Sequence, residues 1–303
     1  MTNRIPPMMI AAGAVACGSV MDAIIKHLAV ETPVMQVVAW RYILGAAFTL
    51  SLVAIRRKPL PNLAGIRFHT LRGLIVGATG ICFFYTLTQL ALSEATVLIF
   101  AAALMIAPVA RILLKEKISA FTAIATLIGF AGIAIATLTG ETMGAPPEGN
   151  RLMGLVIGLM SSVLYAIGVV MLRKRTGQED SITIVAFSNT IPAILLLPFA
   201  FAMPMQELRA MLTLLGIASL LGVGIWWLMT LAYARAPAQK LAPIEYTALI
   251  WATILGWTMF NERPHWTLYA GAVVVILACL AVAFETRFTT RREAKTPASD
   301  IVH

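Results

Sequence analysis

Ten long apolar runs follow one another along the chain and are separated by short polar connections. Each run has about twenty residues, which is the length that a helix needs to cross a bilayer, and lacks the two-residue alternation of barrel strands. Backbone polar groups in lipid must be paired within the chain, so the runs are expected to be helices. We predict spans at residues 8–28, 33–55, 70–90, 95–114, 119–139, 151–172, 181–201, 210–233, 238–260 and 266–284.

The composition agrees with a polytopic protein embedded in the lipid bilayer. Charged residues make up only 12% of the chain and mean hydropathy is +0.86, whereas soluble domains carry about 25% charged residues. The net charge of +9 comes from short basic clusters between the apolar runs, so we expect no nucleic-acid partner. The first run is long and carries Asp22 and Lys26, unlike a signal-peptide core, and is therefore read as a retained helix.

The basic residues also predict the orientation, because cytoplasmic loops are enriched in Lys and Arg. With the N-terminus inside, the inner segments hold 18 Lys and Arg residues and the outer loops hold 3. We therefore predict a protein of the cytoplasmic (inner) membrane with both termini in the cytoplasm. The outer three are Arg151, Arg209 and Arg263.

Two stretches share one plan, an apolar run that ends in a short polar segment. They are residues 96–119 and 242–264, and their acidic residues Glu116 and Glu262 lie 146 positions apart in a chain of 303. Such self-similarity indicates a duplicated unit. Five helices per unit is an odd number, so the second unit must enter the membrane from the opposite side. The predicted fold is an all-α membrane protein with ten transmembrane helices in two inverted five-helix repeats, at 1–140 and 151–284, joined by an external linker at 141–150 and followed by a cytoplasmic tail at 285–303.

Ionisable groups inside a membrane are candidates for function because they are costly when unpaired. Asp22 and Lys26 are four residues apart and share a helix face. One interpretation is a neutralised structural pair. The other is that Asp22 lines a cavity and binds a substrate cation or a coupling proton, with Lys26 tuning it.

A second candidate lies near the cytoplasmic start of the ninth run. Pro237 and Pro243 should loosen this segment, and freed carbonyls beside Glu245 would suit a cation or a proton. Pairing of Glu245 with Lys240 is the structural alternative. The neighbouring Tyr246 either contacts substrate or packs.

Other polar and aromatic residues occur at helical spacing. Arg41 is expected chiefly to anchor the second helix to carbonyls or a carboxylate, and Glu116 and Glu262 to brace helix ends. Same-face sets are Tyr85 with Gln89, Ser161 with Tyr165, and Trp226 with Thr230. The predicted substrate-binding set is Asp22, Lys26, Arg41, Tyr85, Gln89, Tyr165, Trp227, Glu245 and Tyr246.

Motifs for catalysis or nucleotide use are absent from the sequence. It has no Gly-Lys pair for a phosphate-binding loop, no GxSxG, no HExxH and no paired CxxC. We expect no catalytic residues, no cofactor and no metal. An intramembrane enzyme would need a convergent set of reactive groups that the sequence does not assemble.

The chain resembles the drug/metabolite transporter superfamily with EamA-type repeats over about residues 8–284. The resemblance lies in the polar segments KEKIS and NERPH, each of which is followed by a Gly-containing helix, IGFAGIAIA or AGAVVVILA. The resemblance implies a secondary carrier that binds a small molecule in a central cavity between the repeats. Four short segments are similar to the S-adenosylmethionine uptake branch of this superfamily, namely DAIIKHL, VAWRYI, HTLRGL and APIEY. An exporter of amino acids or drug-like cations is the alternative, and assembly with further copies of the chain is left open.

Overall fold

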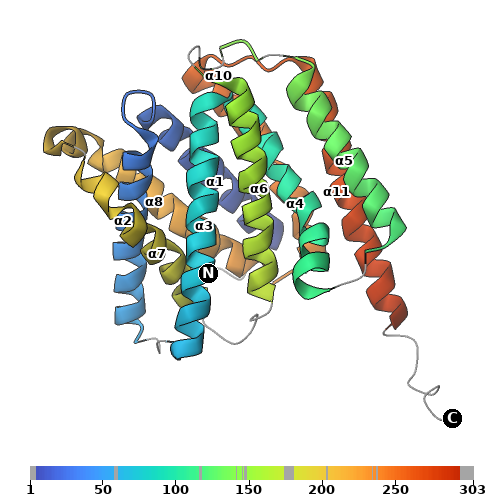
Figure 1. Ribbon diagram of the computed structural model, residues 1–303, viewed down its shortest axis with the longest axis horizontal. Coiled ribbons are helices and arrows are strands. Elements are labelled where there is room, and N and C mark those ends of the chain that lie inside the picture. The colour runs from blue at the N-terminus through green and yellow to red at the C-terminus, as the bar shows by residue number, and fades with distance from the viewer. Residues whose placement is uncertain are drawn as a thin grey trace.

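The computed structural model describes residues 5–57, 61–115, 118–140, 142–144, 146, 149–173, 181–202, 204–233, 235–236 and 238–293. This part of the chain is helical apart from its connections and one isolated backbone bridge between Met143 and Arg263 (Figure 1). The helices are α1 (Pro7–Leu28), α2 (Val34–Ile55), α3 (Leu63–Gln89), α4 (Leu92–Leu114), α5 (Ala120–Leu138), α6 (Arg151–Arg173), α7 (Ser181–Phe201), α8 (Met205–Tyr233), α9 (Ala238–Glu245), α10 (Ala248–Phe260) and α11 (Trp266–Glu293).

The ninth predicted span is a broken helix. In the described residues, nine helices are long and apolar enough to cross a membrane, whereas α9 has 8 residues and α10 has 13. The two pieces meet at Tyr246 and Thr247, shortly after Pro243. The segment is interrupted, but α9 continues through Pro243 and ends two residues later, so the break does not lie in the preceding turn that a proline crowds. Loosening of the segment by its prolines stays a prediction.

Two helix starts differ from the prediction. Helix α3 begins at Leu63, not near residue 70, because the Asn62 side chain accepts a hydrogen bond from the backbone N–H of Gly65 at 2.8 Å. This is an N-cap, which satisfies one of the free donors of a helix start. Helix α8 begins at Met205, five residues before the predicted start. Both extensions add polar residues at the ends of apolar runs.

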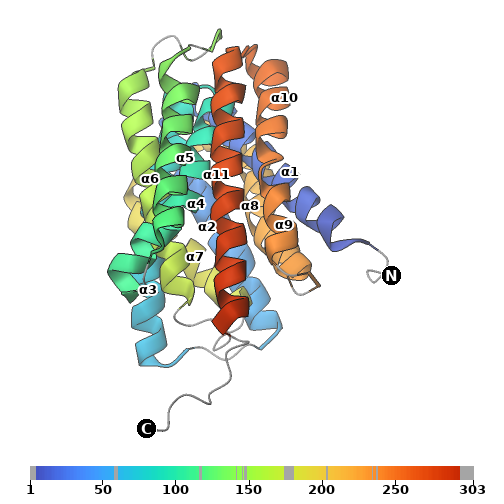
Figure 2. The same ribbon diagram turned by 90° about the vertical axis from the view of Figure 1, so that its right-hand side faces the viewer.

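The two halves of the chain interlock. Helix α1 packs along α8, and its counterpart α6 packs along α3 in the same way. Helix α2 packs on α7, and α5 packs on α11 (Figure 2). Exchanging each helix of the first half for its counterpart in the second half reproduces these pairs. The ends of α1 and α3 and the start of α6 lie at one end of the bundle, since Lys26 contacts the Leu90 carbonyl and Gln89 contacts the Asn150 amide. Helices α1 and α6 therefore run in opposite directions, as inverted repeats require.

Glycines allow the closest helix contacts. Gly132 on α5 and Gly271 on α11 face each other, and a Cβ atom at Gly132 would lie 2.9 Å from the carbonyl oxygen of Gly271. Gly73 and Gly77 allow α3 to approach α7 in the same way, with a Cβ at each lying 2.8 Å from a side-chain atom of Ile191 or Pro192. The small residues thus serve close packing, as they commonly do in membranes.

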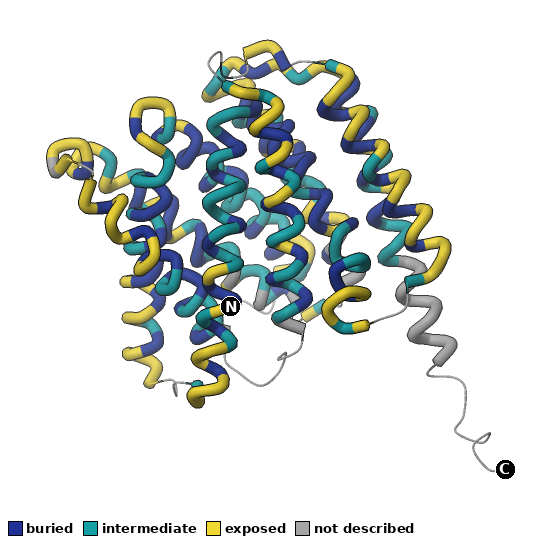
Figure 3. Tube along the Cα trace, viewed as in Figure 1, coloured by how far each residue is buried: buried dark blue, intermediate teal, exposed yellow. Residues whose placement is uncertain are grey.

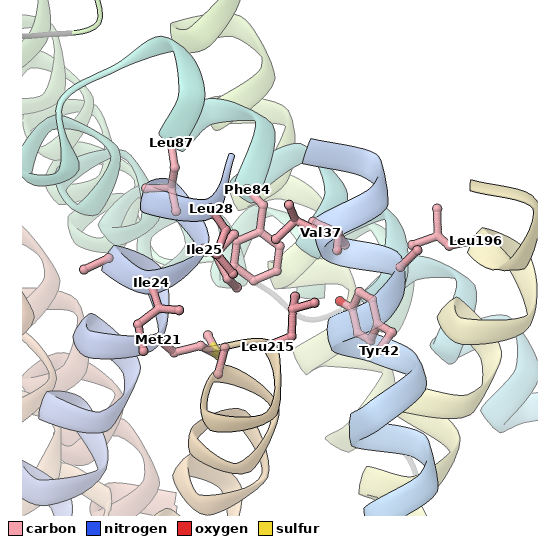
Figure 4. Close-up of a cluster of buried hydrophobic side chains, with 14 of the residues drawn as sticks. Met21, Ile24, Ile25, Leu28, Val37, Tyr42, Phe84, Leu87, Leu196 and Leu215 are labelled. Atoms are coloured by element: carbon pink, nitrogen blue, oxygen red, sulfur yellow. The ribbon is translucent and has the colours of Figure 1, made fainter. Parts of the chain in front are cut away.

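The largest buried cluster lies where α1, α2, α3, α7 and α8 meet. Its members include Met21, Ile25, Tyr42, Phe84 and Leu215 (Figure 4). The outward faces of the helices are exposed and apolar, as on α5, where Ile124 and Leu127 are 58% and 69% exposed (Figure 3). An apolar outer surface is the one expected in contact with lipid.

Candidate functional site

A buried ion pair joins Lys26 near the end of α1 to Glu262 in the connection after α10. The Lys26 Nζ lies 2.5 Å from the Glu262 Oε1, and the two side chains are 5% and 1% exposed. The Lys26 Nζ also donates to the Leu90 carbonyl at 2.6 Å, and the Glu262 Oε2 accepts from the Leu92 backbone N–H at 2.8 Å. Every polar atom of this pair that faces the protein is therefore used, and Glu262 caps the start of α4.

A second ion pair lies beside it. Glu94, in the first turn of α4, is 1% exposed and accepts from the Arg151 Nη1 at 3.0 Å and from the Thr142 hydroxyl at 2.9 Å. The Arg151 Nη2 donates to the carbonyls of Thr137 and Gly140 at 2.7 and 3.0 Å. We call the end of the bundle that holds Lys26, Glu94, Arg151 and Glu262 the ion-pair end.

Each of the two ion pairs links one half of the chain to the other. Lys26 and Glu94 belong to the first half, and Glu262 and Arg151 to the second. Opening this end would separate buried charges, which costs several kcal/mol per unpaired group. The two ion pairs therefore hold the two halves of the chain together at the ion-pair end in this structure.

The predicted pairing of Lys26 with Asp22 is wrong. Lys26 pairs instead with Glu262, which lies 236 residues away in the sequence. Among the described residues, Lys26 is the cation that pairs with the buried Glu262 carboxylate, whereas Asp22 is partly exposed. The predicted bracing role of Glu262 is confirmed, whereas Glu116 lies outside the described residues.

Asp22 and Arg41 lie in the interior, toward the middle of α1 and α2. Both side chains are partly exposed, and their charges interact. The Arg41 guanidinium lies over the rings of Tyr42 and Phe84, with 4.3 and 5.5 Å from its Cζ to the two centroids. The Ser219 hydroxyl of α8 donates to the Arg41 backbone carbonyl at 3.0 Å.

The expectation that Arg41 anchors α2 through carbonyls or a carboxylate is wrong for the described part of the chain. Its Nε is buried without a hydrogen-bond partner there. Aromatic rings hold the guanidinium in place by cation–π contact, which leaves its hydrogen-bond donors unused. At this level the Ser219 hydroxyl joins α8 to the backbone of α2.

A further polar group lies closer to the opposite end of α3. Arg72 is only 4% exposed and donates from Nη1 to the Ser188 hydroxyl of α7 at 2.8 Å. Tyr165 on α6 is 41% exposed, and the charges of Arg72 and Glu245 both act on it. The structure therefore brings the predicted residues Tyr165 and Glu245 into one neighbourhood and adds Arg72, which was not among the predicted site residues.

The remaining predicted site residues are spread over the bundle. Tyr246 packs edge-to-face on Phe100 with 5.2 Å between ring centroids, and interacts with the Cys279 thiol. Gln89 accepts from the Asn150 backbone N–H at 2.7 Å at the ion-pair end. Tyr85 is partly exposed and Trp227 is 60% exposed, while the side chains of Trp226, Thr230 and Lys240 lie outside the described residues. Substrate contact by these residues stays a prediction.

Glu94 is the functional candidate that sequence reasoning missed. The predicted fourth span begins at residue 95, which leaves Glu94 in the connection before it. Its sequence signal is a lone carboxylate in the first turn of an apolar helix, where the helix dipole favours negative charge.

Comparison with known proteins identifies the family. The EamA-like transporter family matches the chain twice, over residues 5–138 and 152–284. The chain belongs to the EamA-like transporter family. It is a multi-pass membrane transporter with a small-molecule substrate, and its family and relatives are transporters, not enzymes.

Named relatives of this EamA-like transporter handle different compounds. An S-adenosylmethionine uptake transporter of Rickettsia prowazekii is 24% identical over 269 residues, which cover 89% of each chain. A pseudopaline exporter, CntI, of Pseudomonas aeruginosa is 24% identical over 277 residues, which cover 88% of this chain and 91% of the exporter. An uncharacterized transporter of Helicobacter pylori is 25% identical over 279 residues, with the same two coverages.

The fold has a counterpart among solved structures. One crystal structure covers 90% of this chain and 98% of its own, with a TM-score of 0.55 and 20% sequence identity. This likeness concerns the fold alone. Within the described residues, no group of three or more His, Cys, Asp or Glu side chains is placed to hold a metal ion.

Proposed function

We propose that this EamA-like transporter is a secondary carrier that moves a small metabolite across the cytoplasmic membrane by alternating access. The observation that carries the proposal is the arrangement of its charges. Partly exposed Asp22 and Arg41 lie inside the bundle, beneath an end that two buried ion pairs close. A binding group that can be reached from one side at a time is what alternating access requires.

The orientation follows from the basic residues. Arg56, Arg57, Arg111, Lys115 and Arg173 lie at the ends of α2, α4 and α6 that are opposite the ion pairs. By the positive-inside rule that end is cytoplasmic, and the start of α1 and the end of α11 lie on the same side. The ion-pair end is then external, with the linker at 141–150, and the structure is closed toward the outside.

S-adenosylmethionine or a related metabolite is the first substrate to test. An uptake transporter for this compound is 24% identical over most of the chain, and the four short segments at residues 22–28, 38–43, 69–74 and 242–246 point in the same direction. Export of amino acids or drug-like cations is the second candidate. The exporter of pseudopaline, which is equally similar to this chain, supports it.

Ligand-dependent unfolding of the purified protein in detergent tests the substrate. The panel is S-adenosylmethionine, S-adenosylhomocysteine, amino acids, riboflavin and quaternary amines. A ligand at a hundredfold its Kd should stabilise the native state by about 2.7 kcal/mol. Stabilisation by S-adenosylmethionine that disappears in Asp22→Asn supports the uptake function. Stabilisation by amino acids or amines alone supports the export function instead.

Counterflow in proteoliposomes tests transport itself. A carrier preloaded with unlabelled substrate accumulates labelled substrate and saturates, whereas a channel does neither. Product analysis by mass spectrometry in the same vesicles would reveal chemical turnover. Unsaturable flux, or conversion of the added compound, would overturn the proposal.

Asp22 and Glu245 are the candidates for proton coupling because both are carboxylates on membrane-spanning segments. Transport by Asp22→Asn and Glu245→Gln should lose part of its pH dependence if either residue carries the coupling proton. Full pH dependence in both variants would exclude them as the coupling groups.

A further inference from the structure

The linker between the two halves of the chain passes over the ion-pair end. The Thr142 hydroxyl donates to the Glu94 Oε1 at 2.9 Å, and Thr142 is 5% exposed. The Met143 N–H donates to the Arg263 carbonyl at 3.1 Å, and the Arg263 N–H donates to the Met143 carbonyl at 2.7 Å. Figure 1 shows the linker and the connection between α10 and α11 at the same end of the bundle. We call residues 142–144 the strap.

The contacts of the strap close a ring around the start of α4. Arg263 directly follows Glu262, and the Glu262 Oε2 accepts from the Leu92 N–H at 2.8 Å. Leu92 and Glu94 both lie in the first turn of α4. The ring therefore runs from Glu94 through the strap and Glu262 back to α4. Each of its two carboxylates also belongs to one of the buried ion pairs.

Two residues specify the backbone path of this ring. Gly144 has a φ of +82°, and a Cβ atom there would lie 2.5 Å from the carbonyl oxygen of Asn261. Glycine permits both this dihedral angle and this close approach. Asn261 has a φ of 54°, in the left-handed region that asparagine adopts more readily than most residues. The strap is therefore seated against the connection that carries Glu262.

Movement at one ion pair reaches the other through the strap. Glu262 cannot move away from Lys26 without moving Arg263, the next residue. Because the strap is bonded to Arg263 through two backbone hydrogen bonds, this movement also displaces the Thr142 hydroxyl from Glu94. Glu94 is 1% exposed, and a buried charged acceptor that loses a donor is unfavourable.

We propose that the strap couples the two ion pairs, so that the external end of the transporter opens in one step, with Thr142 as the positioning residue that transmits the movement. The coupling rests on the proposed alternating-access function and specifies how this end opens. The rival route is the first turn of α4, which also joins the two carboxylates but does not involve the strap.

Two cysteine probes report separately on the two ion pairs. Ala91, which is 0% exposed, lies between the two residues whose backbone atoms Lys26 and Glu262 contact. Thr137, which is 3% exposed, has the carbonyl that accepts from the Arg151 Nη2. Ala91→Cys and Thr137→Cys are introduced one at a time into the full-length protein without its three native cysteines. Labelling by a membrane-impermeant maleimide is measured in proteoliposomes.

Lys26→Met and Arg151→Met each break one ion pair and leave the strap contacts in place. If the two pairs open together, each variant should accelerate labelling of both probes by the same factor, because both probes report one open state. The acceleration should be about tenfold or more, since the remaining buried carboxylate loses its cation.

Cutting the strap should separate the two responses. Thr142→Val removes the hydroxyl and keeps the shape of the side chain. In this background Lys26→Met should still accelerate labelling at residue 91, but it should change labelling at residue 137 by less than about threefold, as expected for independent sites. Gly144→Ala should have the same effect, because its Cβ would crowd the Asn261 carbonyl.

Three control variants accompany the experiment. Thr142→Ser keeps a hydroxyl and should restore the shared acceleration. Met143→Ala shortens a side chain that is 71% exposed and keeps the backbone bridge, so it should behave as the native protein. Gly216→Ala, whose added Cβ has no atom within 4 Å, should leave labelling unchanged. If Thr142 only stabilised the fold, its loss would accelerate labelling of both probes alike, so separation of the two responses identifies coupling.

The coupling is overturned if Lys26→Met leaves labelling at residue 137 unchanged while the native strap is present, because the pairs then open independently. It is also overturned if Thr142→Val and Gly144→Ala leave the shared acceleration intact, which would assign the coupling to the first turn of α4. Saturable counterflow would in either case leave the proposed transport function standing. Absence of saturable counterflow for every compound would instead refute that function.

Discussion

Breaking the Lys26–Glu262 ion pair should loosen the closed end of the transporter. Lys26→Met leaves Glu262, which is 1% exposed, with the Leu92 backbone N–H as its remaining partner at 2.8 Å. Removing one member of a buried pair typically costs about 3–5 kcal/mol, because the other charge stays buried. If that free energy favours opening of this end, the open population rises by roughly two to four orders of magnitude.

Cysteine labelling from the ion-pair side measures this opening. Ala95, one residue after Glu94, is 0% exposed, and Ala95→Cys in a background without the three native cysteines provides the probe. A membrane-impermeant maleimide should react slowly in this background and much faster after Lys26→Met. Glu262→Gln should act in the same direction, and the double variant should be less destabilised than the two single effects together, since no lone charge remains.

The control for this experiment is Arg111→Met, which removes an exposed charge at the opposite end of the bundle. It should change neither labelling nor unfolding temperature appreciably. If Lys26→Met lowers the unfolding temperature without faster labelling, the pair is a structural brace and does not control opening. If Lys26→Met changes neither the labelling rate nor the unfolding temperature, the reasoning about the ion-pair end is refuted.

Three further predictions follow from the packing. Glu94→Gln should accelerate labelling less than Lys26→Met, because Arg151 keeps two carbonyl acceptors; equal acceleration would contradict this. Gly271→Ala should separate α5 from α11 and cost about 1–3 kcal/mol in thermal unfolding, whereas Gly216→Ala should cost far less. Tyr246→Phe should leave the KM for transport unchanged, since this ring packs on Phe100; a raised KM would place its hydroxyl at the substrate.

The sequence predicted the helices better than the partners of their charges. Apolar runs of bilayer length locate the spans, although the break of the ninth at residues 246–247 lies beyond Pro243 and is not marked by it. The ends were less certain because caps such as Asn62 lie outside the apolar pattern. Helix periodicity can relate Asp22 to Lys26, but it carries no information about a carboxylate 236 residues away. The two ion pairs arise from tertiary packing between the halves.

The same limit applies to the candidate site. Asp22 and Arg41 stood out in the sequence as charges within apolar runs, yet only the structure shows that neither is paired within the described chain. Arg72 lies near the start of the predicted span at 70–90, whereas α3 begins at Leu63, which places this residue more than two turns inside the helix. Its bond to Ser188 joins α3 to α7, a contact that no local pattern predicts.

The contrast between satisfied and unsatisfied charges separates two roles in this transporter. A charge that is fully bonded at the ion-pair end stabilises one conformation, and its removal should act on opening. A charge that is held in place by aromatic rings but has no hydrogen-bond partner stabilises the empty protein poorly, and its removal should act on ligand choice. Lys26 and Glu262 belong to the first class, and Arg41 belongs to the second. A variant at Arg41 that changed labelling at Ala95 but left the choice of ligand unchanged would show that this division is wrong.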